Sequence, residues 1–146
     1  MKKAGRERGR SGKYSLQAVG YVRSELKKRK NAPRQGYLGA PEAWVEILPR
    51  YAKCLQLVET GQDAIVITFL HQAKRNVMKV HPGRDLKNPL TGVFGTRSPD
   101  RPNPLGLHRV KIVERDGLRL RVEALEAIDG TPVVDMKPVL AKSGDS

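Results

Sequence analysis

The chain has 146 residues, of which 38% are hydrophobic, and a formal net charge of +13. This length suits one domain with a single core, and a mean hydropathy of −0.52 is that of a soluble protein. The longest apolar run, residues 64–70, is too short to cross a bilayer, and the charged first residues show no secretory signal. We therefore expect a cytoplasmic protein without a membrane partner.

The thiol and imidazole groups give no metal-binding pattern. The single cysteine, Cys54, excludes an intrachain disulfide and a cysteine-cluster metal site. It lies among apolar residues and is expected to be buried. His71, His81 and His108 lack the spacing of metal ligands, so we expect no metal site.

Basic residues occur in three groups along the chain. The first 13 residues contain almost no apolar side chain and predict a disordered basic arm. Two further groups lie inside the domain: Arg23, Lys27, Lys28, Arg29, Lys30 and Arg34, and then Lys74, Arg75, Lys79, Arg84 and Lys87. This charge favours a polyanionic partner such as RNA, with a generic solubility charge as the alternative. Aromatic residues make up only 5%, which argues against a base-stacking platform.

The first half of the chain predicts three strands and one helix. Residues 16–23 alternate partly and predict a first strand, residues 31–41 a loop rich in Pro and Gly, and residues 43–48 a second strand. Residues 49–58 place Tyr51, Cys54, Leu55 and Val58 at helical spacing. Residues 64–70 are apolar and β-branched, which is typical of a central strand.

The second half continues as antiparallel β structure. Residues 107–113 and 118–125 predict two strands joined at Asp116-Gly117, a strong hairpin signal. Residues 133–136 predict a final short strand. The chain is therefore mainly β, with one short helix and long loops rich in Pro and Gly. It lacks the alternating strands and helices, and the glycine-rich first turn, of a doubly wound Rossmann-type fold. The predicted domain covers residues 14–141, followed by a tail over 142–146.

Residues 92–107 form the most informative loop. They carry three prolines and three glycines, which excludes a long helix. We expect Phe94, Leu105 and Leu107 to anchor the loop to the core, so that its polar side chains are held as fixed donors. These donors are Arg97, Arg101 and Asn103. The alternative is a crossover whose arginines face water.

Three ordered blocks resemble one known family. The run T-R-S-P-D-R-P-N-P-L-G-L at residues 96–107 resembles the signature of the TrmO/TsaA-like family of S-adenosylmethionine-dependent tRNA methyltransferases. Residues 128–138 resemble its D-G-T-P-x-x-D-x-K-P block, and residues 32–36 its P-R-Q element. The resemblance implies a single small antiparallel β-barrel, S-adenosyl-L-methionine as cofactor, tRNA as partner, and a homodimer. Many members have a further C-terminal domain.

The same resemblance implies a set of cofactor-binding residues: Pro33, Arg34, Gln35, His71, Gln72, Arg97, Leu107, Ile128, Asp129, Gly130 and Thr131. Arg101 and Asn103 are candidates for binding the substrate, because a guanidinium suits carboxylate and phosphate oxygens. Asp135 and Lys137 lie two residues apart and are expected to form an ion pair. No residue is identified as the catalytic base.

The resemblance implies methylation of the exocyclic nitrogen of threonylcarbamoyladenosine, next to the tRNA anticodon. Two alternatives remain open on the residues alone. The same cofactor could serve a different RNA or a small-molecule acceptor. A non-catalytic basic β-barrel that binds RNA or senses the cofactor fits the charge equally well.

Overall fold

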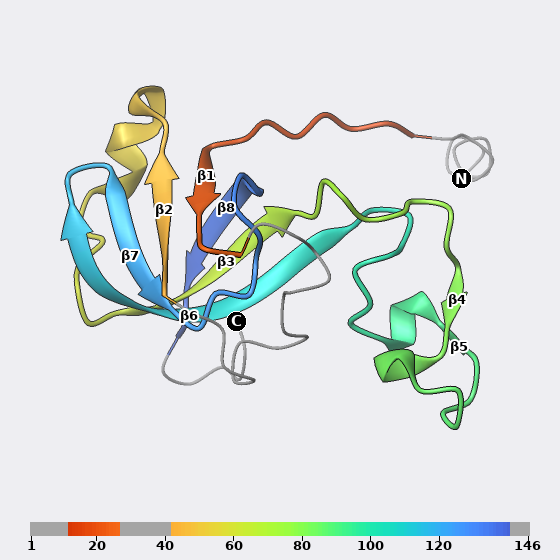
Figure 1. Ribbon diagram of the computed structural model, residues 1–146. Coiled ribbons are helices and arrows are strands. Elements are labelled where there is room, and N and C mark those ends of the chain that lie inside the picture. The colour runs from red at the N-terminus through yellow and green to blue at the C-terminus, as the bar shows by residue number, and fades with distance from the viewer. Residues whose placement is uncertain (1–11, 27–41, 141–146) are drawn as a thin grey trace.

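The computed structural model describes residues 12–26 and 42–140 (Figure 1). Most of the predicted basic arm, the predicted cofactor residues Pro33, Arg34 and Gln35, and the tail from residue 141 lie outside the described residues. In the described part of the chain no helix is long and apolar enough to cross a membrane.

Six strands close into a barrel in which every neighbouring pair is antiparallel. Around the ring these are β1 (Gly20–Arg23), β2 (Ala43–Ile47), β7 (Arg119–Glu123), β6 (Leu105–Asp116), β3 (Asp63–Phe69) and β8 (Pro132–Pro138). The pairing of β1 with β8 closes the ring, which removes exposed sheet edges. The predicted mainly β, non-Rossmann fold is confirmed.

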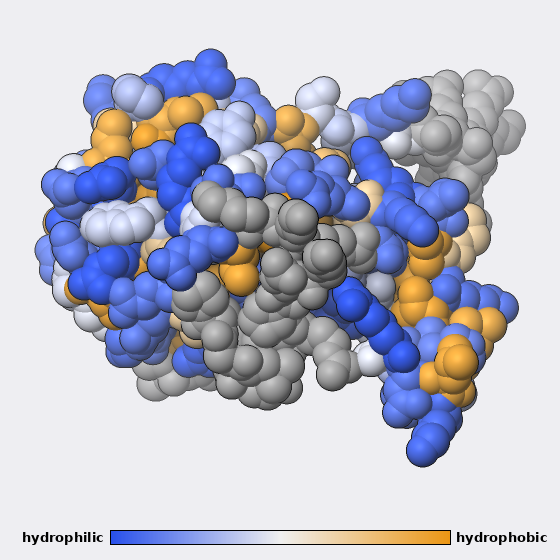
Figure 2. All heavy atoms as spheres, in the orientation of Figure 1, coloured by the Kyte–Doolittle hydropathy of each residue, from blue (hydrophilic) through white to orange (hydrophobic). Residues whose placement is uncertain are grey.

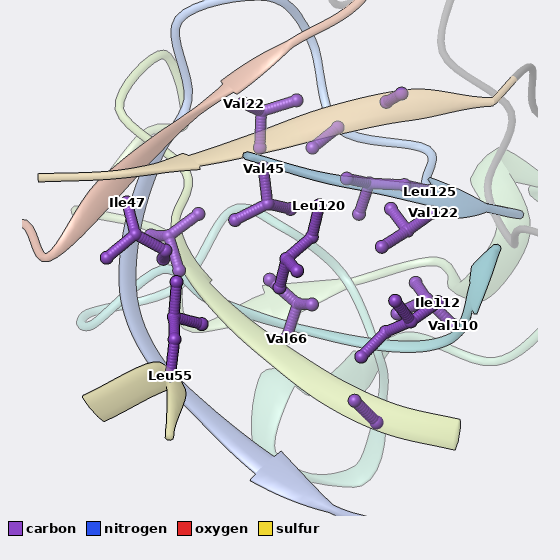
Figure 3. Close-up of a cluster of buried hydrophobic side chains, with 14 residues drawn as sticks. Val22, Val45, Ile47, Leu55, Val66, Val110, Ile112, Leu120, Val122 and Leu125 are labelled. Atoms are coloured by element: carbon purple, nitrogen blue, oxygen red, sulfur yellow. The ribbon is translucent and has the colours of Figure 1, made fainter. Parts of the chain in front are cut away.

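The barrel core comes from the alternation of side chains along the strands. In β6 the buried residues recur at every second position from Gly106 to Ile112. Figure 3 shows Val22, Val45, Val66 and Leu120 pointing toward one another between the strands, and each is fully buried. Burial of each such side chain contributes about 1.5–3 kcal/mol, so the core supplies the main stabilisation of the ring.

The predicted helix over residues 49–58 is a shorter 3-10 helix, η3 (Pro49–Leu55). Its winding buries Leu55 and leaves Cys54 exposed, so the expectation of a buried cysteine is wrong. Arg115 of β6 fixes the end of η3 by donating from Nη1 to the carbonyls of Leu55 and Val58, at 2.7 Å each.

Residues 71–104, here called the lobe, project from the barrel between β3 and β6 (Figure 1). The lobe contains the two-stranded sheet of β4 (Lys79–Val80) and β5 (Thr91–Gly92) and the short 3-10 helices η4 (Pro82–Arg84) and η5 (Val93–Gly95). It begins at the end of β3 and returns at the start of β6, so its two ends enter adjacent strands.

Two expectations about packing of the loop are corrected. Phe94 is 90% exposed, while its neighbour Val93 is buried and anchors η5 instead. Leu105 and Leu107 are 41% and 44% exposed, because the strand alternation turns the intervening Gly106 inward. The anchors of the loop are therefore Val93 and the fully buried Pro104.

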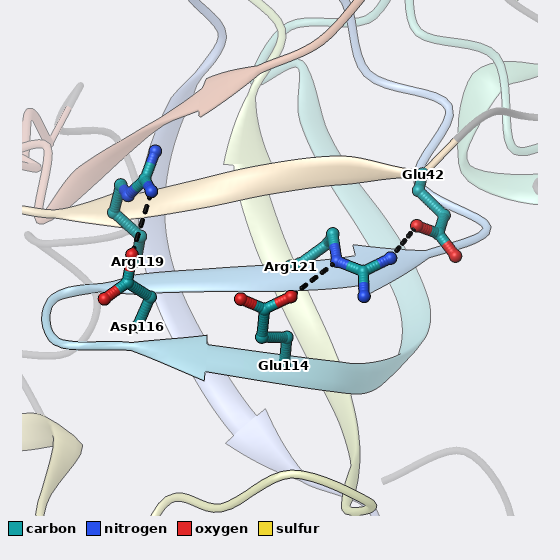
Figure 4. A network of polar contacts seen from close by, with 5 residues as sticks. All are labelled: Glu42, Glu114, Asp116, Arg119 and Arg121. Atoms are coloured by element: carbon teal, nitrogen blue, oxygen red, sulfur yellow. Dashed lines mark hydrogen bonds and ion pairs between the residues drawn. The ribbon is translucent and has the colours of Figure 1, made fainter.

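The outer face of β6 and β7 carries a network of exposed ion pairs (Figure 4). Arg121 donates to Glu42 and, from Nε, to Glu114 at 3.1 Å. These hydrogen bonds stabilise the charged guanidinium and raise the pKa of Arg121 above its ordinary value. Arg119 pairs with Asp116 at 2.9 Å, close to the Gly117 turn, whose φ of +61° fits the predicted hairpin. Such exposed pairs add little to stability.

Gly20→Ala should destabilise the barrel. A Cβ at this position would lie 2.3 Å from the backbone oxygen of Glu46 in β2, so the closing strand would have to move. We expect a loss of about 1–3 kcal/mol in the free energy of unfolding, measured by urea denaturation. Gly92→Ala is the matched control, since a Cβ there meets nothing within 4 Å. Equal stability of the two variants would contradict this account of the β1–β2 contact.

Candidate functional site

A cavity of about 650 Å³ lies between the lobe and the end of the barrel at which β3 ends and β6 begins. We call this end the barrel mouth. The lining residues come from the end of β3, the lobe, the start of β6 and the turn before β8: Leu70–Gln72, Val80–Arg84, Thr96–Arg101, Leu105–His108, Glu126–Ile128 and Thr131. Segments far apart in the sequence thus meet in one concave surface.

The cavity brings together most of the predicted site residues that the structure describes. His71, Gln72, Arg97, Leu107, Ile128, Thr131 and the predicted substrate residue Arg101 all line it. The outward-facing Leu105 and Leu107, expected to pack in the core, contribute apolar surface here. Ligand sites combine such apolar surface with a few placed polar groups.

Three predicted residues do not line the cavity, and two of them hold the turn before β8 in place. Asp129 accepts a hydrogen bond from the Ser24 backbone at 3.0 Å. The backbone nitrogen of Gly130 donates to the Val22 carbonyl at 2.8 Å, and its φ of +82° is one that glycine adopts readily. These bonds fix the turn that presents Ile128 and Thr131 to the cavity.

Asn103, the third of these residues, and Arg101 both hold the lobe. Asn103 accepts a hydrogen bond from Arg75 at 3.0 Å. Arg101 donates from Nη1 and Nη2 to the carbonyl of Thr96 at 3.2 and 3.1 Å, and from Nη2 to Val93. Arg101 therefore ties the loop that carries Arg97 to η5.

The lobe is also fastened to itself and to the barrel. The backbone nitrogen of Lys74 donates to Asp100 at 2.8 Å, and Arg75 Nε donates to the Pro102 carbonyl at the same distance. The backbone nitrogen of Leu70, directly after β3, donates to the carbonyl of Pro104 at 2.8 Å. The signature loop is thus held at both ends, as a preorganised site requires.

Sequence reasoning missed a hydrogen-bonded set of side chains at the barrel mouth. Thr68 Oγ1 lies 2.6 Å from His108 Nε2, and His108 Nδ1 lies 2.6 Å from Glu126 Oε1. His108 and Glu126 line the cavity, whereas Thr68 lies beneath them with no exposed surface. One signal was available: His108 has the same alternation as the apolar Val110, which places it inside the barrel.

Gly106 leaves room for this set. A Cβ at residue 106 would lie 2.4 Å from Thr68 Oγ1 and 2.5 Å from His108 Nε2. Only glycine lets β6 pass so close to the two buried side chains.

The charges around the cavity have two signs. The lobe contributes Arg84, Arg97, Arg101 and the carboxyl of Asp100, and the barrel mouth contributes the carboxyl of Glu126. Elsewhere, Asp135 and Lys137 form the expected ion pair at 3.2 Å and line a separate cavity of about 920 Å³ beside η3. That larger cavity contains none of the predicted cofactor residues. Among the described residues, no group of three His, Cys, Asp or Glu side chains is arranged to hold a metal ion.

Two proteins with similar sequences are described as probable S-adenosyl-L-methionine-binding proteins. A probable S-adenosyl-L-methionine-binding protein of Archaeoglobus fulgidus is 44% identical over 123 residues, which cover 84% of this chain and 33% of that protein. A protein of Methanothermobacter thermautotrophicus with the same description is 43% identical over 123 residues, which cover 84% of this chain and 88% of that protein. The chain therefore spans about a third of the first relative and most of the second.

Solved structures of TrmO have the same fold. One is 30% identical with a TM-score of 0.71, covering 92% of this chain and 62% of that one. TrmO from Pseudomonas aeruginosa is 27% identical with a TM-score of 0.68 and the same coverage. The family model described as the tRNA-methyltransferase O N-terminal domain matches residues 21–145. The cavity at the barrel mouth thus includes residues from two of the three signature blocks, and the chain belongs to the tRNA-methyltransferase O N-terminal domain family.

Proposed function

We propose that this protein is an S-adenosylmethionine-dependent tRNA methyltransferase that binds its cofactor in the cavity at the barrel mouth. One observation carries the proposal: residues 71–72, 96–101, 105–108, 126–128 and Thr131, which include parts of two of the three signature blocks, line a single cavity. The relatives named as S-adenosyl-L-methionine-binding proteins support the choice of cofactor. The family description supports tRNA as the partner.

The chemistry of the lining residues fits this cofactor. Its adenosine needs apolar surface, which Leu105, Leu107 and Ile128 supply. Its carboxylate needs a cation, and Arg97 lies on the lobe side of the cavity. A volume of about 650 Å³ is within the usual range for a small-molecule site.

When bound, the cofactor supplies an electrophilic methyl group on a positively charged sulfur. The protein's contribution is to orient the two reactants and to exclude water. The rigid lobe and the start of β6 form facing walls for this purpose. The lobe also carries Lys74, Arg75, Lys79 and Lys87 as exposed cations, which support the approach of a phosphate backbone beside the cavity.

For the acceptor we propose the exocyclic nitrogen of threonylcarbamoyladenosine next to the tRNA anticodon. The threonyl group bears a carboxylate, and the arginine-rich wall of the cavity supports binding of such an anion. Arg101 and Asn103 remain the predicted substrate residues. The bonds from Arg101 to the carbonyl of Thr96 also support a role in holding Arg97.

Arg97→Ala should weaken binding of S-adenosylmethionine. Loss of one charge-assisted hydrogen bond corresponds to roughly tenfold or more in Kd, measured by isothermal titration calorimetry. Arg50→Ala is the matched control, since Arg50 lies on η3 and does not line the cavity. Unchanged affinity in the Arg97 variant would exclude this arginine as a cofactor ligand.

The acceptor is tested by incubating the protein with S-adenosylmethionine and bulk tRNA and analysing the nucleosides by mass spectrometry. We expect one added methyl group on threonylcarbamoyladenosine and no transfer to tRNA that lacks this modification. Methylation of another nucleoside would establish a different RNA acceptor. Cofactor binding without transfer to any tRNA would favour the non-catalytic alternative.

We further propose that two copies of the chain associate through the lobe. Figure 2 shows apolar residues on the surface of the lobe. The exposed apolar residues of the lobe include Met78, Leu86 and Phe94, which are 75%, 81% and 90% exposed. Apolar patches of this kind favour association between proteins. The homodimer implied by the family resemblance is consistent with such a contact.

Phe94→Ser should therefore shift the protein toward the monomer in sedimentation velocity experiments. Leu57→Ser is the control, because Leu57 is 76% exposed but lies outside the lobe. A monomeric wild-type protein, or equal behaviour of both variants, would contradict association through the lobe.

A further inference from the structure

Glu126 is the acidic end of a buried chain of hydrogen bonds at the barrel mouth. The side chains of His108 and Glu126 are 4% and 16% exposed, and their atoms Nδ1 and Oε1 are 2.6 Å apart. Thr68 Oγ1 lies 2.6 Å from His108 Nε2 and is fully buried. Glu126 and His108 line the cavity, so the chain of bonds runs from the barrel interior to the ligand site.

The hydroxyl of Thr68 determines which nitrogen of His108 carries the proton. A buried hydroxyl hydrogen needs an acceptor, and within the described residues the only bond of this hydroxyl is to His108 Nε2. Thr68 therefore donates, Nε2 accepts, and the imidazole proton lies on Nδ1. From there it is donated to Glu126 Oε1, which makes His108 a neutral donor.

In the part of the chain that the structure describes, this tautomer leaves the carboxylate of Glu126 without a cation paired to it. Within the described residues its one ion-pair partner by distance is His108, which is neutral in this arrangement. The flanking residues Leu125, Ala127 and Ile128 are buried and apolar. A largely buried carboxylate without a cation is costly, so its position at the cavity favours a ligand that brings a positive charge.

We propose that Glu126 recognises the charged sulfur of S-adenosylmethionine and that His108 and Thr68 are positioning residues for its carboxylate. The inference rests on the proposed function, since it assumes that this cofactor occupies the cavity. It adds a residue outside the three signature blocks and assigns it a defined task. Binding of the methylated, cationic form would then be favoured over the demethylated thioether.

The test compares the affinities of S-adenosylmethionine and S-adenosylhomocysteine by calorimetry. Both ligands carry the ammonium and carboxylate groups, and only the first carries a positive charge on sulfur. In Glu126→Gln, which keeps the bond from His108 Nδ1, we expect S-adenosylmethionine to bind roughly tenfold or more weakly, with little change for S-adenosylhomocysteine. Glu123→Gln, on an exposed position of β7, is the control for net charge.

Two comparisons between variants test the carboxylate of Glu126 and the hydroxyl of Thr68 separately. Glu126→Asp keeps the charge and should keep more of the preference for the cationic ligand than Glu126→Gln. Thr68→Val removes the hydroxyl that fixes His108 and should reduce the preference, whereas Thr68→Ser should retain it. A merely structural role would change the affinities for both ligands together, with a matching fall in Tm.

The outcomes separate the two proposals. If the wild type binds both ligands and Glu126→Gln weakens them equally, the carboxylate recognises the ammonium or only supports the fold, and the inference is wrong while the proposed function stands. If the wild type binds neither ligand, the proposed cofactor site and this inference both fail. A selective loss of S-adenosylmethionine affinity supports both.

Discussion

The pairing of β3 with both β6 and β8 is the constraint on which the site depends. β3 is antiparallel to β6 from Asp63↔Lys111 to Phe69↔Leu105, and its other edge pairs with β8. The end of β3, the start of β6 and the turn before β8 must therefore lie together. Any ligand site built from these segments is located by backbone hydrogen bonds and not by the side chains that line it.

The interior of the barrel changes character along its length. Toward η3 it is filled with apolar side chains such as Leu55, Ile112 and Leu120, which contribute through burial. At the mouth, Thr68 and His108 replace apolar residues and satisfy one another's hydrogen bonds. Polar groups are tolerated in a core on this condition. The barrel can thus present the carboxyl of Glu126 to the cavity, and among the described residues no buried side-chain polar atom is left unpaired.

The lobe supplies the other wall of the cavity, although it has only a small sheet and two short 3-10 helices. Its sheet has two strands of two residues each, so its shape depends on specific hydrogen bonds that Arg75 and Arg101 donate and that Asp100 accepts. These bonds hold the signature loop in a fixed conformation. The same loop leaves Phe94 and Leu86 exposed, so the lobe combines a fixed inner face with an apolar outer face.

The sequence alone determined the mainly β architecture, the approximate strands, the hairpin at Gly117 and the family, because alternation, turn residues and ordered motifs are local signals. Most of the predicted site residues that the structure describes also line the cavity, since most of them lie in those motifs. Tertiary structure decided the contacts between residues that are far apart in the sequence, which local patterns cannot predict. Closure of the ring placed Glu126 beside His108, 18 residues away, and Thr68 beside His108, 40 residues away. The 3-10 winding of η3 exposed Cys54, and strand alternation turned Leu107 from a supposed core anchor to the wall of the cavity. Such contacts depend on which strands pair, and pairing is a property of the whole ring.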